Sequence, residues 1–328
     1  MDTVRLGIIG MGNMGSGHLN NVMSGKCPRI NVTAFADTDP EKLNKAAETC
    51  PSAKAFSDAN EMLDSGPIDA ALIAVPHYDH PRLAMECFRR GIHVITEKPC
   101  SLSRKSAEAM FRAADQAGRR LYVAQVVQFA RETEVLRQAV REERYGKPLD
   151  GFFERLSARP AWSQGGWLLD RDKSGLLPFD LHIHDLDLIV SLFGAPDDFA
   201  VSPCAANLGI RDHLRVCYSW KNGMTVCGEA AWFNAPIPFA ARWRVYFDRG
   251  MMIFDGQTVT GYAADGEITV FDTSDPVQIA SGINLPTNGW FYRELSHFLR
   301  CAEKNEPSPL VPESQVLAVL SVVEKLPA

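Results

Sequence analysis

Short apolar runs alternate with segments of helical periodicity over residues 1–124. The apolar runs predict strands, and the segments between them, in which apolar residues recur every three to four positions, predict helices. The predicted strands are residues 4–9, 31–36, 70–75, 93–96 and 121–124, and the predicted helices are residues 12–24, 40–50, 81–90, 103–117 and 131–144. This alternation is typical of βαβ units, so we expect a doubly wound parallel sheet in residues 1–124.

Beyond residue 150 the pattern changes, and between Arg215 and Asp272 short strands follow one another with turns between them. The turns are marked by KNG (221–223), DRG (248–250), DGQ (255–257) and ADG (264–266), and further helices are predicted at 180–193, 288–304 and 312–325. Strands joined by such turns predict antiparallel sheet. We therefore expect an α/β fold with two domains, a parallel one in residues 1–124 and an α+β one in residues 125–328.

The stretch GIIGMGNMG (7–15) places Gly10-x-Gly12-x-x-Gly15 directly after the first predicted strand and at the start of a predicted helix. Gly10 permits a tight turn, Gly12 lets the backbone approach a pyrophosphate, and Gly15 permits close packing of helix on strand. The helix N-terminus adds amides and a positive dipole. The alternative is a glycine-rich turn that only packs. The pattern predicts a Rossmann-type dinucleotide site with contacts from Gly10, Gly12, Asn13, Met14 and Gly15.

An aspartate at the end of the second predicted strand indicates which dinucleotide is preferred. Asp37 follows the glycine loop at the distance where such sites carry an acidic residue, and Thr38 lies beside it. A carboxylate there accepts hydrogen bonds from the adenosine ribose hydroxyls and repels a 2′-phosphate, and no arginine stands next to it in the sequence. We expect NAD to be favoured over NADP.

Composition excludes several classes of protein. The chain has 328 residues with 46% hydrophobic and 23% charged positions, a net charge of −6 and no basic block, which argues against nucleic acid or an anionic membrane as a partner. No apolar run has the length of a membrane span, and the N-terminus has no signal-type pattern. The eight cysteines are scattered without a CxxC pair. We expect free thiols in a cytoplasmic protein.

The segment DLHIHDLDL (180–188) concentrates three aspartates and two histidines on an apolar background. On a helix Asp180 and His184 share one face, which suits a helix that is buried on one side and faces a cleft on the other. His182 lies on the opposite side of a helix, but shares the Asp180–His184 face if the chain is still extended there. Asp185 and Asp187 are interpreted as structural, on a solvated face or as partners for a neighbouring helix. Asp180, His182 and His184 could hold zinc or manganese, but no distant Cys/His cluster completes a ligand shell, so no metal is expected.

Four motifs together make the chain similar to a known family. They are AVPHYDH (74–80), TEKPCS (96–101) with its EKP at Glu97–Pro99, SGLLPFDLHIHDLD (174–187) ending in DxxxHxxD, and YRELSHFLRCAEKNEPSP (292–309). With the glycine loop in front, the chain resembles the Gfo/Idh/MocA oxidoreductases, the glucose–fructose oxidoreductase and inositol dehydrogenase family. The resemblance covers nearly the whole chain. It implies an N-terminal Rossmann domain and a C-terminal domain with a large open, mostly antiparallel sheet that makes subunit contacts, in a homodimer or homotetramer.

The resemblance also implies an activity, the NAD(H)-dependent oxidation of a secondary hydroxyl in a sugar, inositol or related polyol, or reduction of the matching ketone. The cofactor takes the hydride, and the protein must take the proton and support the developing alkoxide. By family analogy His184 is the general acid/base, Lys98 contacts the reacting hydroxyl and the nicotinamide ribose, and Asp180 orients Lys98 or the substrate. Residue type alone would make Lys98 a solvated lysine and His184 a helix histidine without a catalytic role.

Further residues are placed near ligands by position. Val75, Pro76, His77 and His80 lie in the loop after a predicted strand, where a Rossmann fold opens onto its ligand. The two histidines are expected to contact the nicotinamide ribose or to hold the loop, and the alternative is that they are polar loop or helix-start residues. The remaining predicted cofactor contacts are Glu97, Lys98 and Gln125, and the predicted substrate contacts are Lys98, Trp162, Trp167, Asp180, His182 and His184. Packing is the alternative for the two tryptophans. Gln128 could also face the nicotinamide or substrate, and His18 is interpreted as structural.

Departures from the family pattern concentrate where substrate or nicotinamide should lie. They are His77 in place of the usual asparagine, Ser174-Gly175 in place of a glycine run, Gln128-Phe129 in place of an Arg-Phe pair, and His182. Two other functions stay open. Some relatives are NAD-using glycosidases or lyases that return the hydride, and some are ligand sensors without catalysis. The presence of Lys98, Asp180 and His184 argues against a sensor.

Overall fold

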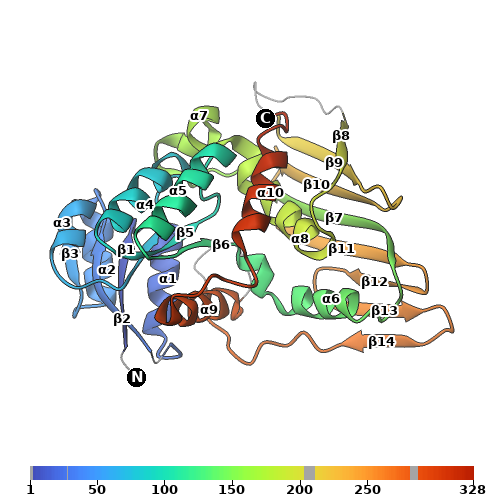
Figure 1. Ribbon diagram of the computed structural model, residues 1–328, viewed down its shortest axis with the longest axis horizontal. Coiled ribbons are helices and arrows are strands. Elements are labelled where there is room, and N and C mark those ends of the chain that lie inside the picture. The colour runs from blue at the N-terminus through green and yellow to red at the C-terminus, as the bar shows by residue number, and fades with distance from the viewer. Residues whose placement is uncertain (1–2, 28, 203–210, 281–286) are drawn as a thin grey trace. The chain divides into compact units, whose positions relative to one another are not determined.

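The computed structural model describes residues 3–27, 29–202, 211–280 and 287–328 (Figure 1). The chain forms two compact units. The first comprises Met1–Val126 and Asp275–Glu313, and the second comprises Val127–Ser274 and Ser314–Ala328. The first crossing lies two residues from the predicted boundary at residue 124. The return of 275–313 to the first unit differs from the sequence-based division, which gave that segment to the second domain.

A six-stranded parallel sheet forms the centre of the first unit, with strand order β3-β2-β1-β4-β5-β6. Its elements are β1 (Val4–Ile9), α1 (Asn13–Met23), β2 (Ile30–Ala36), α2 (Pro40–Thr49), β3 (Lys54–Phe56), α3 (Ala59–Asp64), β4 (Ala70–Ile73), η1 (His77–Asp79), α4 (His80–Arg89), β5 (His93–Glu97), α5 (Arg104–Gln116), β6 (Leu121–Ala124) and α9 (Trp290–Lys304). Helix α1 packs on α2 and α9, and α4 packs on α3 and α5. The predicted doubly wound parallel domain is confirmed.

Local sequence explains most of these elements. Every residue of β4 and β5 is buried, as expected for strands covered on both faces. Helix α2 begins as predicted, with Pro40 in its first turn and the Asp39 side chain accepting from the Glu41 amide. The sequence did not predict β3 or α3. Strand β3 has three residues, two of them exposed, which is too short for a periodic pattern.

Helix α9 belongs to the first unit through aromatic contacts. Phe298 stacks on Tyr122 of β6 at a centroid distance of 5.3 Å, and Phe291 meets the edge of His18 on α1 at 5.4 Å. The Tyr122 hydroxyl also donates to the carbonyl of Glu306, just after the helix, at 2.8 Å. The chain therefore completes its N-terminal unit with a helix from near its C-terminus.

The second unit is built on an eight-stranded sheet with strand order β14-β13-β12-β11-β7-β10-β9-β8. Its elements are α6 (Arg131–Arg141), β7 (Pro148–Ala158), η3 (Gln164–Leu169), α7 (Arg171–Ser174), η4 (Pro178–His182), α8 (Ile183–Phe193), β8 (Asp198–Ser202), β9 (His213–Ser219), β10 (Thr225–Phe233), β11 (Ala240–Phe247), β12 (Gly250–Phe254), β13 (Val259–Ala263), β14 (Ile268–Phe271) and α10 (Glu313–Val323), while η2 (Val126–Phe129) spans the unit boundary. All pairings are antiparallel except the central β7–β10 pair. The predicted mostly antiparallel sheet is confirmed.

The two faces of this sheet differ. One face packs on α8, which contacts β7 and β10, and α6 packs against α8 (Figure 1). Residues on that face, such as Phe153, Val226 and Val245, are buried. The opposite face carries exposed apolar side chains on its β11–β14 half, namely Tyr246, Tyr262, Ile268 and Val270. Among the described residues, helices thus cover one side of the sheet, and the β11–β14 half of the other side carries exposed apolar side chains.

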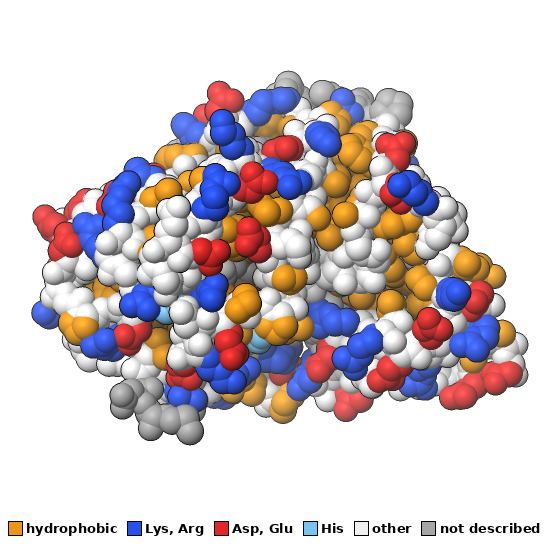
Figure 2. Space-filling view, in the orientation of Figure 1, with side chains coloured by type: hydrophobic (Ala, Val, Ile, Leu, Met, Phe, Trp, Pro, Cys, Tyr) orange, Lys and Arg blue, Asp and Glu red, His pale blue; other side chains and the backbone are white. Residues whose placement is uncertain are grey.

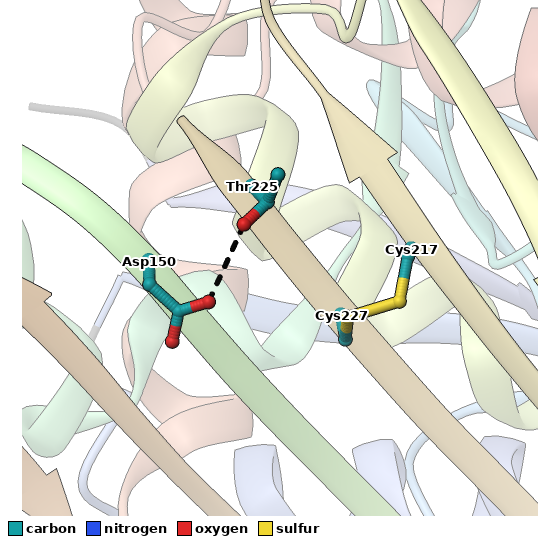
Figure 3. The surroundings of a disulfide bond; sticks show 4 residues. All are labelled: Asp150, Cys217, Thr225 and Cys227. Atoms are coloured by element: carbon teal, nitrogen blue, oxygen red, sulfur yellow. Dashed lines mark hydrogen bonds between the residues drawn. A yellow bond between two sulfur atoms is a disulfide. The ribbon is translucent and has the colours of Figure 1, made fainter. Parts of the chain in front are cut away.

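A disulfide joins two neighbouring strands of this sheet. Cys217 on β9 and Cys227 on β10 are direct cross-strand partners with their Cα atoms 4.1 Å apart. Figure 3 shows the bond, with Thr225 of β10 turned toward Asp150 of β7. The expectation of free thiols is wrong for this pair. It holds for Cys27, Cys50, Cys87, Cys100 and Cys301, which are free and buried.

The surface agrees with the mixed charge of the sequence. On the face drawn in Figure 2, basic and acidic side chains are interspersed, and neither sign covers an extended area. Among the residues that the structure describes, no helix is long and apolar enough to cross a membrane.

Candidate active site

The glycine loop joins β1 to α1 at the carboxyl edge of the parallel sheet. Gly10 has a φ of +93°, and a Cβ on it would lie 2.5 Å from the carbonyl oxygen of Ala74, so the turn and the end of β4 approach too closely for a side chain. A Cβ on Gly12 would meet nothing within 4 Å. Space therefore remains beside the first backbone amides of α1, those of exposed Asn13 and half-buried Met14. Amides in the first turn of a helix have no acceptor within the helix.

Asp37 holds this loop as well as facing the ligand edge. Its Oδ2 accepts from the Met11 amide at 2.6 Å, and its Oδ1 accepts from the Asp39 amide at 2.9 Å. The side chain is half-buried, and Thr38 beside it is exposed. The carboxylate is thus fixed just after the end of β2 by two amide donors, and its contact with a ribose stays a prediction.

His80 connects two loops of the same edge. Its Nε2 lies 2.8 Å from the carbonyl oxygen of Val75, after β4, and its Nδ1 lies 2.8 Å from that of Pro99, after β5. The ring is fully buried, which lowers its pKa, and a neutral ring donates to one of the two carbonyls. His77, also buried, lies at a ring distance of 5.9 Å. His80 therefore lies between the two loops and holds them, one of the two roles expected for it.

The EKP segment follows β5. Glu97 is buried and its Oε1 lies 2.8 Å from Nε2 of His18 on α1, while its Oε2 accepts from the Lys98 amide at 3.3 Å. Lys98 is half-buried. His18 has the structural role predicted for it, because it holds the side chain of Glu97 in place. The EKP carboxylate is consequently anchored on the first helix.

The carboxyl edge of the parallel sheet also offers a buried acceptor at its β6 end. Gln125, directly after β6, is buried, and among the described residues no group hydrogen-bonds to its Oε1. An unused buried acceptor suits an N–H donor such as a carboxamide. The open space at Gly12, the carboxylate of Asp37 and this acceptor lie after different parallel strands, which is where an open α/β sheet binds its ligand.

In the second unit, Asp180 and His184 stand out by exposure. Every residue from Ser174 to Val190 is buried except these two, which are half-buried. The chain there makes a π-helical turn, η4, before α8 begins at Ile183, and the Ile183 amide donates to the Pro178 carbonyl five residues back. Such turns occur frequently at functional sites. The predicted pairing of Asp180 and His184 one turn apart on an accessible side is consistent with this arrangement.

His182 points the other way. It is fully buried, its Nε2 lies 2.6 Å from the Tyr218 hydroxyl of β9, and a Cβ on Gly228 of β10 would lie 2.7 Å from its ring. Burial, with the charge of Arg155 adding to it, lowers the pKa of His182 to about 4, so the ring is neutral near pH 7. The segment is helical, so His182 lies on the side of the helix opposite to Asp180 and His184. It packs on the sheet, whereas a substrate contact was expected to face the accessible side.

Asp185 and Asp187 are structural, but buried instead of solvated. Asp185 forms a bidentate ion pair with Arg155 of β7: Oδ1 accepts from Nη2 at 2.8 Å and Oδ2 accepts from Nε at 2.9 Å. Asp187 accepts from Gln315 of α10 at 2.8 Å and from Gln128 at 2.5 Å. Burial raises the pKa of Asp187 to about 6. Gln128 therefore supports α8 and does not point to a ligand. Arg155 was not predicted from the sequence, where its signal is a charged residue within an alternating apolar segment.

The predicted substrate tryptophans lie between β7 and α7. Trp162 is 58% exposed, and Trp167 within η3 is half-buried. Trp162 is therefore not packed in the core, whereas Trp167 is partly covered. Within the described ranges, no group of three or more His, Cys, Asp or Glu side chains could hold a metal ion.

Comparison with known proteins places this architecture. A family model described as "Oxidoreductase family, NAD-binding Rossmann fold" matches residues 4–125, and one for the GFO/IDH/MocA C-terminal domain matches residues 133–253. The chain belongs to the Gfo/Idh/MocA oxidoreductase family. Its first unit carries the family's NAD-binding domain, so NAD is its cofactor, as the sequence predicted.

Relatives of known function are dehydrogenases. An inositol 2-dehydrogenase of Arthrobacter sp. (strain FB24) is 32% identical over 149 residues, which cover 45% of this chain and 44% of the relative. Inositol 2-dehydrogenase 2 of Paenarthrobacter aurescens is 28% identical over 80% of this chain and 79% of the relative. D-apiose dehydrogenase of Paraburkholderia graminis is 28% identical over 59% and 52%. The chain thus spans less than half of the first relative and about four fifths of the second.

Solved structures share the fold. An oxidoreductase of Agrobacterium radiobacter, in complex with NAD+, L-tartaric acid and magnesium, has a TM-score of 0.84 at 18% identity, covering 98% of this chain and 94% of that one. Levoglucosan dehydrogenase with NADH and levoglucosan has a TM-score of 0.80 at 19% identity, covering 98% and 96%. A UDP-N-acetylglucosamine 3-dehydrogenase of Acidithiobacillus ferrooxidans has a TM-score of 0.80 at 23% identity over the same shares. These matches support the fold.

Proposed function

We propose that the protein is an NAD-dependent dehydrogenase that oxidises a secondary hydroxyl of a sugar, inositol or related polyol, or reduces the matching ketone. The observation that carries the proposal is the exposure pattern of residues 174–190, in which only Asp180 and His184 escape full burial. A proton-transfer pair must be reachable by substrate, and a purely structural pair on this segment would be buried like its neighbours Asp185 and Asp187.

The roles follow from residue chemistry. NAD, when bound, supplies the hydride acceptor. His184 takes the proton from the hydroxyl because an imidazole suits proton exchange near neutral pH. Lys98, fixed through its backbone to Glu97, places an ammonium group to stabilise the alkoxide-like oxygen. Asp180 orients Lys98 or the substrate.

The cofactor contacts that we propose follow the carboxyl edge of the first unit. Asp37 accepts from the adenosine ribose and disfavours a 2′-phosphate, which selects NAD over NADP. The full proposed set is Gly10, Gly12, Asn13, Met14, Gly15, Asp37, Thr38, Val75, Pro76, His77, Glu97, Lys98 and Gln125, with His80 holding the Val75 and Pro99 carbonyls. Trp162 and Trp167 are proposed to contact the sugar-like substrate.

An assay of purified protein with NAD and a panel of sugars, inositols and glycosides tests the function. Accumulation of NADH with a free sugar or inositol supports a dehydrogenase. Cleavage of a glycoside without net NADH indicates the glycosidase or lyase alternative instead. NAD binding without either reaction on any member of a broad panel would indicate the sensor alternative.

We also propose a homodimer or homotetramer formed through the uncovered face of the eight-stranded sheet. Support comes from Ile268 and Val270, which are 64% and 66% exposed on β14, and from Tyr246 and Tyr262 beside them. Such an apolar area is typical of an interface. Sedimentation of Ile268→Lys/Val270→Lys should show a smaller species than the wild type, whereas Asn44→Lys on exposed α2 should not change the assembly. A monomeric wild type would contradict this proposal.

A cytoplasmic location remains our proposal as well, based on the five cysteines that are free and buried among the described residues. Cell fractionation tests it. In a reducing compartment the Cys217–Cys227 pair should be isolated largely as thiols.

A further inference from the structure

A buried carboxyl group in the first unit has no partner that explains it. Glu294 on α9 is 1% exposed, and among the described residues no group hydrogen-bonds to either of its side-chain oxygens. Burying a carboxyl without a partner is costly, and glutamine or leucine would fill the same space at lower cost. Its retention in this place needs a reason other than packing.

Its surroundings are two further titratable groups from two other elements. The charge of Glu97 of β5 acts on Glu294, and Nε2 of His18 of α1 lies 2.8 Å from Oε1 of Glu97. The Nδ1 atom of His18 is buried and, within the described part of the chain, likewise has no hydrogen-bond partner. The amide of Lys98 donates to the other oxygen of Glu97. Helix α1 thus brings an imidazole against the carboxylate that anchors the EKP segment, and α9, which packs on α1, carries a second buried carboxyl on which the charge of Glu97 acts.

The charge state of this cluster follows from its burial. Glu294 is buried, and among the described residues neither of its side-chain oxygens has a hydrogen-bond partner, so its neutral form is favoured. Burial, and then the charge of Glu97, raises the pKa of Glu294 well above its ordinary value. The proton that matters here is therefore the one that burial favours on Glu294.

The cluster also lies at a defined part of the carboxyl edge. Asp37 follows β2, on one side of β1, whereas Glu97 follows β5, on the other side beyond β4. In a doubly wound sheet the two halves of a dinucleotide occupy these two sides. With the adenosine ribose at Asp37, as the proposed function has it, the nicotinamide end lies on the Glu97 side.

We infer that Glu97 and Glu294 form a proton-linked positioning pair that releases its proton when NAD+ binds and keeps it when NADH binds. This inference rests on the proposed placement of the cofactor. The nicotinamide ring of NAD+ is positively charged and that of NADH is neutral. A positive charge near the pair favours its doubly ionised form, and the proton leaves to solvent. By linkage, the same coupling tightens NAD+ binding relative to NADH as pH rises.

Calorimetric titration measures this directly. NAD+ and NADH are titrated into the wild type in buffers of different ionisation enthalpy, between about pH 6 and pH 9, where neither cofactor nor an ordinary carboxyl titrates. We expect release of up to one proton with NAD+, close to none with NADH, and a dissociation constant for NAD+ that falls by up to tenfold per pH unit below the pKa of the pair. Glu294→Gln should bind NAD+ without releasing a proton.

Two controls make the outcome decisive. Asp187→Asn removes another buried carboxyl with a raised pKa, in the second unit, and should leave the proton release unchanged. Binding of NAD+ without proton release, or release that persists in Glu294→Gln, overturns the inference while the proposed function stands. A wild type that does not bind NAD+ overturns both. If Glu294→Gln does not fold, the wild-type comparison of NAD+ with NADH still decides, because equal pH dependence for the two contradicts the inference.

Discussion

Arg155 of β7 and Asp185 of α8 form a buried two-pronged ion pair that joins the eight-stranded sheet to the helix carrying His184. Both side chains are almost fully buried, so removing one partner leaves a charge without compensation. We expect Asp185→Asn to lower the free energy of unfolding by about 3–5 kcal/mol, measured by urea denaturation. The exposed pair of Arg82 and Asp79 is the control, and Arg82→Gln should cost less than about 1 kcal/mol. Equal costs for the two variants would contradict the assigned role of the buried pair.

The proposed proton-transfer roles predict a separation of turnover from cofactor binding. Lys98→Ala and His184→Ala should each lower kcat by about 10²- to 10⁴-fold, because a group that acts on the reacting hydroxyl is lost. The dissociation constant for NAD, measured by calorimetry, should change little for His184→Ala. Lys45→Ala, at an exposed position on α2, is the matched control for loss of a lysine. Near-normal kcat in either of the first two variants on the true substrate means that the role is misassigned.

Asp37 should govern the choice between NAD and NADP. Asp37→Ala loses charged hydrogen bonds to the ribose, so the dissociation constant for NAD should rise roughly 10- to 100-fold while discrimination against NADP falls. The same change also removes the acceptor for the Met11 amide. Asp37→Asn removes the charge and one of the two acceptor oxygens but retains the other, so it should relax discrimination with less loss of NAD affinity than Asp37→Ala. An unchanged ratio of the two affinities in both variants contradicts this assignment.

His182 predicts a pH dependence of stability. Its pKa is about 4 in the folded protein, against an ordinary value of about 6.5 in the unfolded chain. The unfolded state therefore binds more protons between these values, and the stability that is present above about pH 6.5 is lost as pH falls toward 4, by on the order of 3 kcal/mol. The difference in unfolding free energy between wild type and His182→Leu, followed against pH, isolates this contribution. A difference that does not vary with pH would rule it out.

Gly228 tests the packing of the same histidine. A methyl group there would collide with the His182 ring, so Gly228→Ala should destabilise by about 1–3 kcal/mol. Gly223, in the turn before β10, has open space around its Cβ position but a positive φ, so Gly223→Asn is tolerated better. The stabilities of Gly228→Ala and Gly223→Asn are compared by thermal unfolding. An equal loss of stability in both variants would mean that the structure shifts to relieve the collision with His182.

The elements that sequence predicted correctly are those encoded by local patterns. The glycine loop, the buried strands β1 and β6 and the Asp39 cap each depend on a few adjacent residues, and their positions agree with the structure. Strand β7 was missed because it carries Arg155 on its buried side, and that charge is compatible with burial only through Asp185 on another element. The disulfide was missed because pairing Cys217 with Cys227 requires the register of β9 on β10, which spacing alone does not determine.

The candidate site likewise contains residues that local motifs predicted and residues that depend on contacts between distant segments. Asp37, Lys98, Asp180 and His184 follow motifs, and each lies at a strand end or an accessible helix position. The orientation of His182 depended on whether the chain was helical or extended at η4, which periodicity could not decide. Glu294 gave no signal at all, because its burial arises from the docking of α9 on α1, between segments far apart in the sequence.

The return of residues 275–313 to the first unit has a consequence for how such a gene can be rearranged. A fragment that ends at Val126 lacks Phe298, which stacks on Tyr122, and Phe291, which covers His18. The cofactor domain is therefore not encoded by one contiguous segment of the gene. A gene fusion that is to keep all of its packing must carry both of its segments.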